Sequence, residues 1–532
     1  MKIRDVAWAN YRRLPDGQIS ARDHLVLVGP NDTGKSSIAR ALHLCLGMVH
    51  GQVANSISAR DFTDENVPLS ITVTLHDIDD QARAAFPDEI TIGPPEVLVV
   101  ALEATLDPAD PDQKTVRRYF PDGGHDRAPT NDQLKAIGFQ FVPAARSLLR
   151  ELGGASGGAM RSLLSGLDLT ADAAALEAAA NAYRTTLDAS TTLKEFRGEL
   201  AEALTDALPH PVKEEEVRVV SEAELLEDPL SGVTVTVRDG VHNVSLAEQS
   251  DGIRALSVLT LLGLSHRLAR IVAIDEPETH LHPSAQRSVA KTLRSGAGQR
   301  VLVTHSPAIV GEMSPMDIVA FGADRRPRQL ALGSRIGELE ASVRHWSHRL
   351  IEPLTARCVV VVEGVSDRIL MERVAELTGR NLDRLGVAVF ELDGVRLFRL
   401  AYEAFGPPGF NLPLTGLVDE DARVLCADTV GAAPADLEDA GFVVCDPDLE
   451  GVYIDALGVD VVIDTLSASP LITEHSLLAA CGATARDEVT RDKLWRYCGK
   501  HKVAAALAVA ARIDEAQAAS LAPLETLLQL IE

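Results

Sequence analysis

Short apolar runs that end at glycine or acidic residues recur along the whole chain. In the first half these runs are HLVLVG at 24–29, ARIVAID at 269–275 and QRVLV at 299–303. Continuous apolar runs of this length, without polar alternation, indicate strands that are buried on both faces of a parallel sheet. The second half repeats the pattern in CVVVV, VAVFEL, LPLTGLV and GFVVC, at 358–362, 387–392, 412–418 and 441–445. We therefore expect an α/β fold with a parallel sheet in each half.

A different pattern occupies the segment from about 147 to 207, which is rich in Ala, Leu and Glu. Its run ADAAALEAAANAYRTTLDASTTLKEFRGELAEAL places apolar residues at helical spacing. The segment is too short for a long coiled-coil arm. We interpret it as a helical insertion within the first domain and assign it to dimerisation.

Length and composition limit the class of protein. The 532 residues exceed what one hydrophobic core organises, so we expect two or three domains. The six cysteines lie singly without a CxxC pair, which favours buried thiols over a disulfide framework or a zinc site. The chain has no signal-like start and no apolar stretch long enough to cross a bilayer, so we expect a cytoplasmic protein without membrane contact.

The charge balance bears on nucleic-acid binding. Lys and Arg number 51 against 77 Asp and Glu, so the net charge is 51 − 77 = −26. Such a charge opposes global attraction to nucleic acid, and contact with DNA would be local and metal-assisted. Arg344, His345, His348 and Arg349 are candidates for this contact, although a solvated amphipathic helix explains them equally well.

The first strand leads into a phosphate-binding motif. GPNDTGKS at 29–36 fits GxxxxGK[ST], and a helix is expected directly after it. A glycine loop between a strand and a helix points backbone N–H groups and the helix N-terminus at phosphates. We expect Lys35 to contact the β and γ phosphates of ATP and Ser36 to bind Mg²⁺. The expected nucleotide-binding residues of the loop are Gly29, Asn31, Gly34, Lys35, Ser36 and Ser37.

Two further strand ends complete an ATPase pattern. The strand at 269–275 ends in Asp275 and Glu276, where the first acid reaches the Mg²⁺ shell and the second can polarise the attacking water. The strand at 299–303 leads to His305, which is placed to sense the γ phosphate. Functional groups at strand ends are typical of doubly wound α/β folds. His280 and His282 lack a third ligand nearby, and we expect a structural or interfacial role for both.

The run SLAEQSDGIRALSVLTLLGL resembles the signature motif of ABC-type ATPases. In that motif Ser and Gly bind the γ phosphate held by the opposite subunit, which assigns Ser250 and Gly252 to ATP. The usual Ser-Gly-Gly is Ser250-Asp251-Gly252 here, and the extra carboxylate predicts slow ATP turnover. Gln140 is the candidate for the Q-loop residue and is equally well explained as an ordinary strand residue.

Acidic residues gather at the strand ends of the second half. Glu363 ends one strand and Asp367 follows one helical turn later, so both can face the same point. Asp419 and Asp421 follow a further strand, and strand alternation would send both to one side. Glu450 lies after the last strand, where Asp446 and Asp448 are more simply a solvated rim. Carboxylates grouped in this way suit Mg²⁺ or Mn²⁺ and two-metal phosphodiester chemistry, with a solvated acidic surface as the alternative.

Two lysines near the end of the chain are candidates for transition-state stabilisation. Lys500 and Lys502 lie just before a predicted helix in KLWRYCGKHKVAAALAVAARI. A lysine at this place can neutralise the negative charge that builds up on a phosphate. The sequence does not decide between the two lysines, nor between this role and that of an ordinary surface lysine.

The run EGxSD, followed after a further strand by DxD, resembles a Toprim domain. Behind an ABC-type head with DEPETHLHP, it resembles the OLD (overcoming lysogenization defect) family of ATP-dependent endonucleases. The resemblance implies that Glu363, Asp367, Asp419, Asp421 and Glu450 bind Mg²⁺ or Mn²⁺ and that Lys500 or Lys502 is catalytic. The domains expected are an ATPase at 1–146 and 208–335, the insertion at 147–207, a linker at 336–356 and a Toprim nuclease at 357–532.

The resemblance also implies partners and a role. It implies a homodimer formed through the ATPase half, cleavage of DNA, and action in phage defence or DNA repair, in some members with a helicase-like partner protein. One alternative is an ATPase scaffold for DNA repair whose Toprim acids bind metal or nucleic acid without cutting. Another is topoisomerase or primase chemistry, of which the first needs an attacking tyrosine such as Tyr453 or Tyr497.

Overall fold

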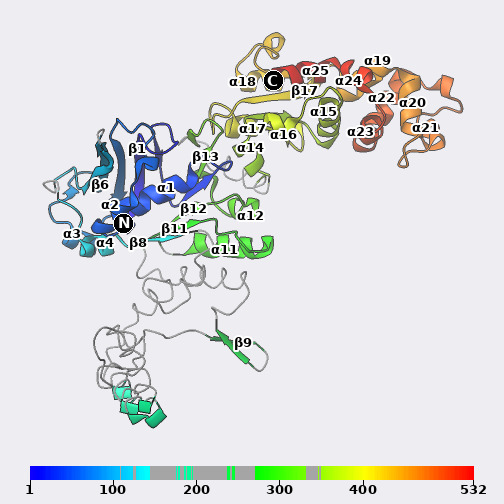
Figure 1. The fold of residues 1–532 in the computed structure, drawn as a ribbon. Helices are drawn as coiled ribbons and strands as arrows, with labels where there is room; N and C mark the ends of the chain where they lie inside the picture. The colour runs from blue at the N-terminus through cyan, green and yellow to red at the C-terminus, as the bar shows by residue number, and fades with distance from the viewer. Residues whose placement is uncertain are drawn as a thin grey trace.

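The computed structural model describes residues 1–107, 110–123, 127–143, 270–296, 298–330, 346 and 349–532. It also describes the antiparallel strands β9 (Thr236–Asp239) and β10 (His242–Ser245) and scattered positions between 175 and 195. Most of these residues form two bodies that lie side by side, one up to residue 330 and one from residue 346 (Figure 1). The predicted insertion at 147–207 lies largely outside the described residues, as do Ser250, Asp251 and Gly252.

The predicted strands of the first half form one sheet. Its order is β14 (Pro327–Gln329), β13 (Ile318–Phe321), β3 (Leu25–Val28), β12 (Gln299–Val303), β11 (Ile271–Asp275) and β8 (Phe139–Val142), and only β14 runs antiparallel. The residues of β3, β12 and β13 are all buried, as expected for strands covered on both faces. The parallel direction brings the carboxyl ends of β3, β11 and β12 to one edge.

Helices follow these strand ends. The helix α1 (Lys35–Leu42) starts directly after the phosphate-binding loop and continues as a π-helical turn, His43–Gly47. The helix α11 (Pro283–Ser295) follows β11, and the short α12 (Pro307–Val310) follows β12. Both α11 and α12 begin with proline in the first turn, where its missing N–H costs nothing.

An antiparallel sheet, which the sequence did not predict, covers α1. Its order is β2 (Gly17–Ser20), β1 (Lys2–Ala9), β4 (Leu69–His76), β6 (Val97–Asp107) and β5 (Ile90–Thr91), and β7 (Asp110–Tyr119) pairs with β6. Along β4 buried and half-buried residues alternate, so one face points to the core. The short helices α2 (His50–Ser56), α3 (Asp80–Ala85) and α4 (Asn131–Ile137) complete this body.

The second body is built on a wholly parallel sheet, in the order β16 (Val387–Glu391), β15 (Cys358–Val362), β17 (Leu414–Asp419) and β18 (Phe442–Cys445). Alternate residues of β15 pack on opposite faces. Val359 and Val361 join a core with α17 (Phe398–Phe405) and α18 (Arg423–Val430), whereas Val360 and Val362 join a core with α15 (Val365–Leu377).

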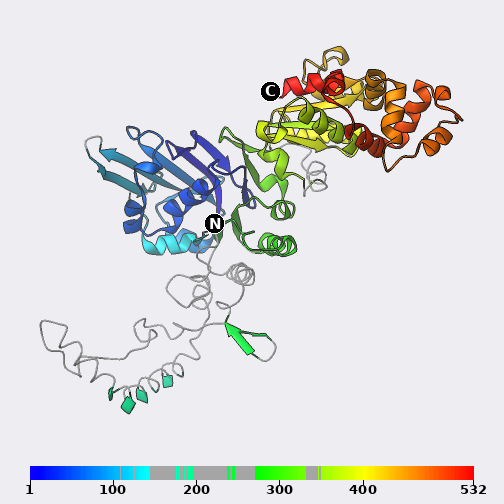
Figure 2. The ribbon, with the colours of Figure 1, turned by 45° about the vertical axis from the view of Figure 1, so that its right-hand side comes forward.

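Further helices pack against the α15 face. They are α19 (Leu449–Leu457), α20 (Val459–Ser467), α21 (Glu474–Ala480), α22 (Arg491–Lys500), α23 (Lys502–Ala510), α24 (Glu515–Ala519) and α25 (Ala522–Leu530). In both views α15 lies beside these orange and red helices, which extend away from the first body (Figures 1 and 2). The short α16 (Leu382–Leu385) precedes β16.

The segment predicted as a linker at 336–356 contributes to the core at its described positions. Trp346, Leu350 and Leu354 are at most 2% exposed, and the last lies in α14 (Ile351–Thr355). They belong to one apolar cluster that continues from β3 and β13 of the first sheet into β15 and α17 of the second. At these described positions, apolar side chains of the segment bridge the two bodies.

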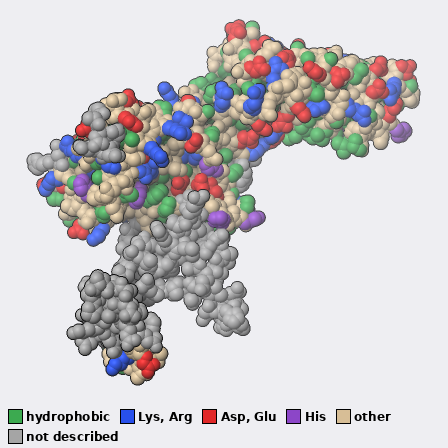
Figure 3. Space-filling model, in the orientation of Figure 1, with side chains coloured by type: hydrophobic (Ala, Val, Ile, Leu, Met, Phe, Trp, Pro, Cys, Tyr) green, Lys and Arg blue, Asp and Glu red, His purple; other side chains and the backbone are tan. Residues whose placement is uncertain are grey.

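Two further observations concern the surface. Among the described helices, none combines the length and the apolar character that crossing a bilayer requires. On the face shown in Figure 3, acidic and basic side chains are interspersed over both bodies.

Candidate nucleotide and metal sites

The phosphate-binding loop adopts the strand, loop and helix arrangement that the motif predicts. Gly34 has a φ of 101°, and a Cβ atom at this position would lie 2.3 Å from Leu14 Cδ2. Only glycine tolerates both the positive φ and the close approach of Leu14. The backbone therefore requires glycine at the position where α1 begins.

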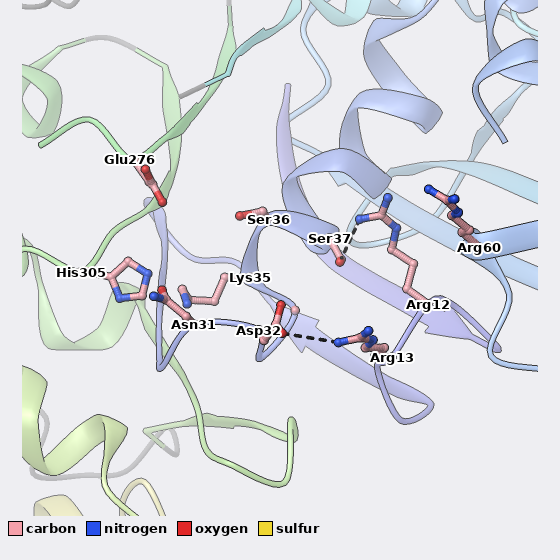
Figure 4. Close-up of a pocket in the computed structure, with 11 residues that line it drawn as sticks. Arg12, Arg13, Asn31, Asp32, Lys35, Ser36, Ser37, Arg60, Glu276 and His305 are labelled. Carbon is pink, nitrogen blue, oxygen red and sulfur yellow. Dashed lines mark hydrogen bonds and ion pairs between the residues drawn. The ribbon is translucent and has the colours of Figure 1, made fainter. Parts of the chain in front are cut away.

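The loop opens into a cleft of about 430 Å³. Its lining residues are Arg12, Arg13, Asn31, Asp32, Gly34, Lys35, Ser36, Ser37, Arg60, Glu276 and His305. In Figure 4, Glu276 and His305 lie on one side of the loop residues, and Arg12 and Arg60 lie on the other side. The structure thus gathers the two predicted catalytic residues of the ATPase half with five of the predicted nucleotide-binding residues, which are Asn31, Gly34, Lys35, Ser36 and Ser37.

Lys35 is held against its own loop. Its Nζ donates to the carbonyl oxygens of Gly29 and Pro30 at 2.8 and 2.6 Å. Burial lowers the pKa of Lys35 to about 8, although the carboxylate of Asp275 opposes this change. A buried ammonium bound only by neutral carbonyls is stabilised by any anion that enters the cleft.

The acids of β11 lie where the sequence placed them. Asp275 ends the strand, and its Oδ1 accepts a hydrogen bond from Ser36 Oγ at 3.2 Å. Burial raises the pKa of Asp275. Glu276 has a φ of 51°, a left-handed conformation that costs a non-glycine residue about 1–3 kcal/mol and is typical of functional sites. Burial, together with the charge of Lys35, lowers the pKa of His305.

Sequence reasoning missed Glu278, which links the two strand ends. Its carboxylate accepts hydrogen bonds from Thr304 Oγ1 at 2.8 Å and from the backbone N–H of His305 at 2.6 Å. Burial raises the pKa of Glu278. The position inside DEPETHLHP, two residues after Glu276, is the signal that could have identified it.

Three arginines of the cleft were also missed, because they come from outside the motif. Arg12 Nε donates to Asp61 at 2.8 Å, and its guanidinium reaches Ser37 Oγ at 3.3 Å (Figure 4). Asp61 is 1% exposed, so it is a fixed anchor for Arg12. Arg13 and Arg60 line the same cleft, which adds positive charge for a polyanion.

The acids of the second body meet at the carboxyl edge of its sheet. Glu363 follows β15, and Asp367 lies in the first turn of α15, where its Oδ2 accepts from Gly364 N at 2.9 Å. Burial raises the pKa of Asp367 to about 6. Asp419 ends β17, and its pKa is raised first by burial and then by Asp367 and Glu363. Asp367 and Asp419 therefore lie close enough for the charge of one to oppose ionisation of the other.

Glu450 and Lys502 complete this cluster from distant segments. Lys502 Nζ lies 3.4 Å from Glu450 Oε2 and 3.9 Å from Asp419 Oδ2. Glu450 is 2% exposed, and burial raises its pKa. Burial opposes the charge of Lys502, but Glu450 and Asp419 outweigh it and raise the lysine pKa. Lys500 is exposed at the end of α22, so of the two candidate lysines the structure brings Lys502 to the acids.

Asp421 departs from the expected alternation. The strand β17 ends at Asp419, and Glu420–Ala422 form a 3₁₀ turn. Glu420 pairs with Arg423 at 2.6 Å, and Asp421 is exposed. The prediction that strand alternation places Asp421 beside Asp419 is wrong, because the extended backbone ends at Asp419 and Asp421 lies in the turn that follows.

The carboxylates of this cluster fit a hard cation by their chemistry, since they supply only oxygen ligands. Glu363, Asp367, Asp419 and Glu450 are the residues that would hold it. Within the described part of the chain, no three His, Cys, Asp or Glu side chains are already grouped as a metal cage. Binding an ion therefore requires these side chains to adjust around Lys502.

The remaining candidates take structural places. His282 caps α11, where its ring nitrogen lies 2.9 Å from Ser284 Oγ, and His280 is exposed. Gln140 is half-buried in β8. Tyr453 and Tyr497 are 1% and 8% exposed, and burial raises the pKa of both phenols. Neither tyrosine is presented as an attacking nucleophile, which disfavours topoisomerase chemistry.

Two family models match the chain in the order that the motifs predict. The model described as "AAA domain, putative AbiEii toxin, Type IV TA system" matches residues 147–311. The model described as "Overcoming lysogenization defect protein-like, TOPRIM domain" matches residues 354–421. The first match contains Asp275, Glu276 and His305, and the second contains Glu363 and Asp419.

Three similar proteins are two OLD proteins and an SMC head domain. An OLD nuclease from Thermus scotoductus is 23% identical over 390 residues, which are 68% of this chain and 71% of that protein. The C-terminal region of the Burkholderia pseudomallei OLD protein is 24% identical with a TM-score of 0.27, over 33% of this chain and 96% of that one. The SMC head domain from Thermotoga maritima is 13% identical with a TM-score of 0.28, over 60% and 95%. By its two matched domains and their order, the chain is similar to the overcoming lysogenization defect proteins, which it matches through an AAA domain followed by a Toprim domain.

Proposed function

We propose that this protein is a metal-dependent DNA endonuclease whose cutting is regulated by ATP. The observation that carries the proposal is the convergence of Glu363, Asp367, Asp419, Glu450 and Lys502 at one sheet edge, although they come from widely separated segments. Carboxylates together with one lysine are what phosphodiester cleavage requires. The name of the Thermus scotoductus relative, OLD nuclease, supports the same reading.

In this proposal the acids bind metal, and the lysine stabilises the transition state. Glu363, Asp367, Asp419 and Glu450 would hold Mg²⁺ or Mn²⁺, with Asp421 as a further candidate at the rim. When bound, the ions supply activation of water and stabilisation of the leaving oxygen. Lys502 directs its ammonium into the same space and neutralises charge on the phosphoryl oxygens as the bond breaks.

The cleft of the first body would bind ATP with Mg²⁺. Lys35, which donates to the carbonyls of Gly29 and Pro30 in this structure, would bind the β and γ phosphates, and Ser36 and Asp275 would hold Mg²⁺. Glu276 would orient the attacking water, and His305 would contact the γ phosphate. Ser250 and Gly252 would complete the site across a homodimer formed by the ATPase half.

The cluster that bridges the two bodies supports communication between the sites. A continuous apolar core joins the strand before the phosphate loop to the strand before Glu363. Movement of the head upon dimerisation would therefore be transmitted to the Toprim sheet. The substrate in this proposal is DNA and the setting is phage defence or DNA repair, with a helicase-like protein as a candidate partner.

The test is cleavage of supercoiled plasmid with Mg²⁺, Mn²⁺ or Ca²⁺, with and without ATP, by wild type and Glu363→Ala. We expect nicked and linear DNA with Mg²⁺ or Mn²⁺ and a loss of at least ~100-fold in Glu363→Ala, because metal contributes several kcal/mol to the transition state. The matched control is Glu352→Ala, which changes a carboxylate of α14 outside the cluster.

Equal behaviour of wild type and Glu363→Ala under every metal would refute the endonuclease. If such a protein still bound DNA, the observations would favour the ATPase scaffold for DNA repair. A cleavage activity that survives in Glu363→Ala but disappears after further purification would mark a contaminating nuclease.

A further inference from the structure

Asp448 is fixed by two donors in the loop before Glu450. It is the N-cap residue of α19, and its Oδ1 accepts from the backbone N–H of Gly451 at 2.7 Å. The indole Nε1 of Trp495 lies 2.9 Å from both carboxylate oxygens of Asp448. Since Trp495 belongs to α22, this hydrogen bond ties the start of α19 to another helix.

The two helices also approach closely beside this bond. A Cβ atom at Gly451 would lie 2.6 Å from Pro447 Cδ and 3.2 Å from Arg491 Nη2, so there is no room for a side chain. Arg491 makes two bonds to Asp455 at 2.9 and 2.7 Å. That pair is 35% and 54% exposed, and exposed pairs contribute little. The half-buried hydrogen bond from Trp495 to Asp448 therefore contributes more to holding α19 against α22 than the exposed Arg491–Asp455 pair does.

The hydrogen bond between Asp448 and Trp495 lies close in sequence to both Glu450 and Lys502. Glu450 lies two residues after Asp448, in the first turn of α19. Lys502 is the first residue of α23, and only His501 separates it from the end of α22. One helix, α22, thus holds the start of the helix that bears Glu450 and leads directly to Lys502. The 3.4 Å contact between Glu450 Oε2 and Lys502 Nζ depends on this arrangement.

We propose that Trp495 is a positioning residue of the Toprim site, which acts through Asp448 to set the separation of Glu450 and Lys502. The inference rests on the proposed function, because it takes Glu450 as a metal ligand and Lys502 as the catalytic lysine. Catalytic groups must be held within about 0.5 Å of their working geometry by the residues around them. Hydrogen bonds one step removed from a metal ligand change metal affinity or activity by about 10- to 100-fold when they are lost.

The test compares Trp495→Phe with Trp346→Phe in the full chain. Both substitutions remove an indole N–H, but Trp346 Nε1 donates to no described residue. We expect Trp495→Phe to raise the Mn²⁺ concentration for half-maximal cleavage about tenfold, and to weaken nucleotide-free Mn²⁺ binding in calorimetry by a similar factor. Trp346→Phe should leave nucleotide-free Mn²⁺ binding unchanged, and ATP hydrolysis should stay unchanged in Trp495→Phe.

Asp455→Asn separates the hydrogen bond from a general loosening of the helices, because it weakens the exposed tie alone. An equal loss of Mn²⁺ affinity in Asp455→Asn and Trp495→Phe would overturn the proposal, and so would wild-type Mn²⁺ dependence in Trp495→Phe. Thermal unfolding without metal reports whether a variant has lost its fold. If the wild type neither binds Mn²⁺ without nucleotide nor cuts DNA, the proposed function itself fails, and the positioning role fails with it.

Discussion

The two candidate sites are each organised around a lysine, and the two lysines have opposite surroundings. Lys35 donates to the neutral carbonyls of Gly29 and Pro30, and burial lowers its pKa to about 8. Burial also disfavours the charge of Lys502, but the carboxylates of Glu450 and Asp419 raise its pKa. For Lys35 burial thus outweighs the nearby acids, whereas for Lys502 the nearby acids outweigh burial.

This difference indicates what each site is built to receive. Arg12, Arg13 and Arg60 add positive charge around Lys35, so the cleft of the first body attracts a polyanion such as a nucleoside triphosphate. The cluster around Lys502 holds Glu363, Asp367, Asp419 and Glu450 against one ammonium, so it attracts a cation. One chain therefore presents two sites of opposite polarity at the carboxyl edges of two parallel sheets.

The largest expected effect comes from removing the lysine of the acidic site. Lys502→Met should lower the rate of DNA cleavage about 100- to 1,000-fold, as loss of one preorganised donor to a transition-state oxyanion does. It should at the same time strengthen nucleotide-free Mn²⁺ binding, because an ammonium 3.4 Å from Glu450 Oε2 no longer opposes the ion. Single-turnover cleavage and calorimetry measure the two effects.

Lys500→Met is the matched control for this experiment, since Lys500 is exposed and two residues away. Its cleavage rate and Mn²⁺ affinity should equal those of the wild type. If Lys500→Met lost cleavage while Lys502→Met kept it, the assignment of the two lysines would be reversed, and the contrast with Lys35 would lose its basis.

The lysine of the basic site should affect a different ligand. Lys35→Ala should weaken ATP binding by about tenfold to a hundredfold, because a hydrogen bond to a charged group contributes ~1.5–3 kcal/mol. Nucleotide-free Mn²⁺ binding at the acidic site should not change. Equilibrium binding of a fluorescent ATP analogue and Mn²⁺ calorimetry test the two statements.

The control for Lys35 is Lys291→Ala on α11, whose side chain is 62% exposed. A loss of Mn²⁺ binding in Lys35→Ala would contradict the separation of the two sites. It would mean that the head controls the shape of the acid cluster even without nucleotide.

The parts that sequence predicted are those whose signal is local. The buried runs gave the strands, and the parallel direction then placed Asp275, His305, Glu363 and Asp419 at strand ends. The phosphate loop followed from spacing alone, since Gly34 and Lys35 are fixed by the turn into α1. Each of these predictions needed only a window of about ten residues.

The parts that sequence missed depend on contacts between distant segments. Arg12 enters the cleft because the buried Asp61 holds it, and no spacing rule connects these two residues. Asp448 reads as part of a solvated rim until the fold brings Trp495 to it. The apolar bridge at Trp346 was hidden within a stretch of polar composition. In each case the deciding partner is remote in sequence.

The smallest expected effect concerns Asp421 and tests whether this residue belongs to the acidic site. Asp419→Asn should lower the rate of cleavage by at least ~100-fold. Asp421 is exposed on a 3₁₀ turn, so Asp421→Asn should lower the rate by no more than about threefold. Steady-state nicking at saturating Mn²⁺ gives both values, and Glu420→Gln controls for loss of a neighbouring charge. If Asp421→Asn were as damaging as Asp419→Asn, the turn would have to unwind when metal binds, extending β17 and restoring the alternation that the sequence predicts. The acidic site would then be assembled by its ligand, while the basic cleft, whose glycine turn already fixes the phosphate loop, would remain the preformed one.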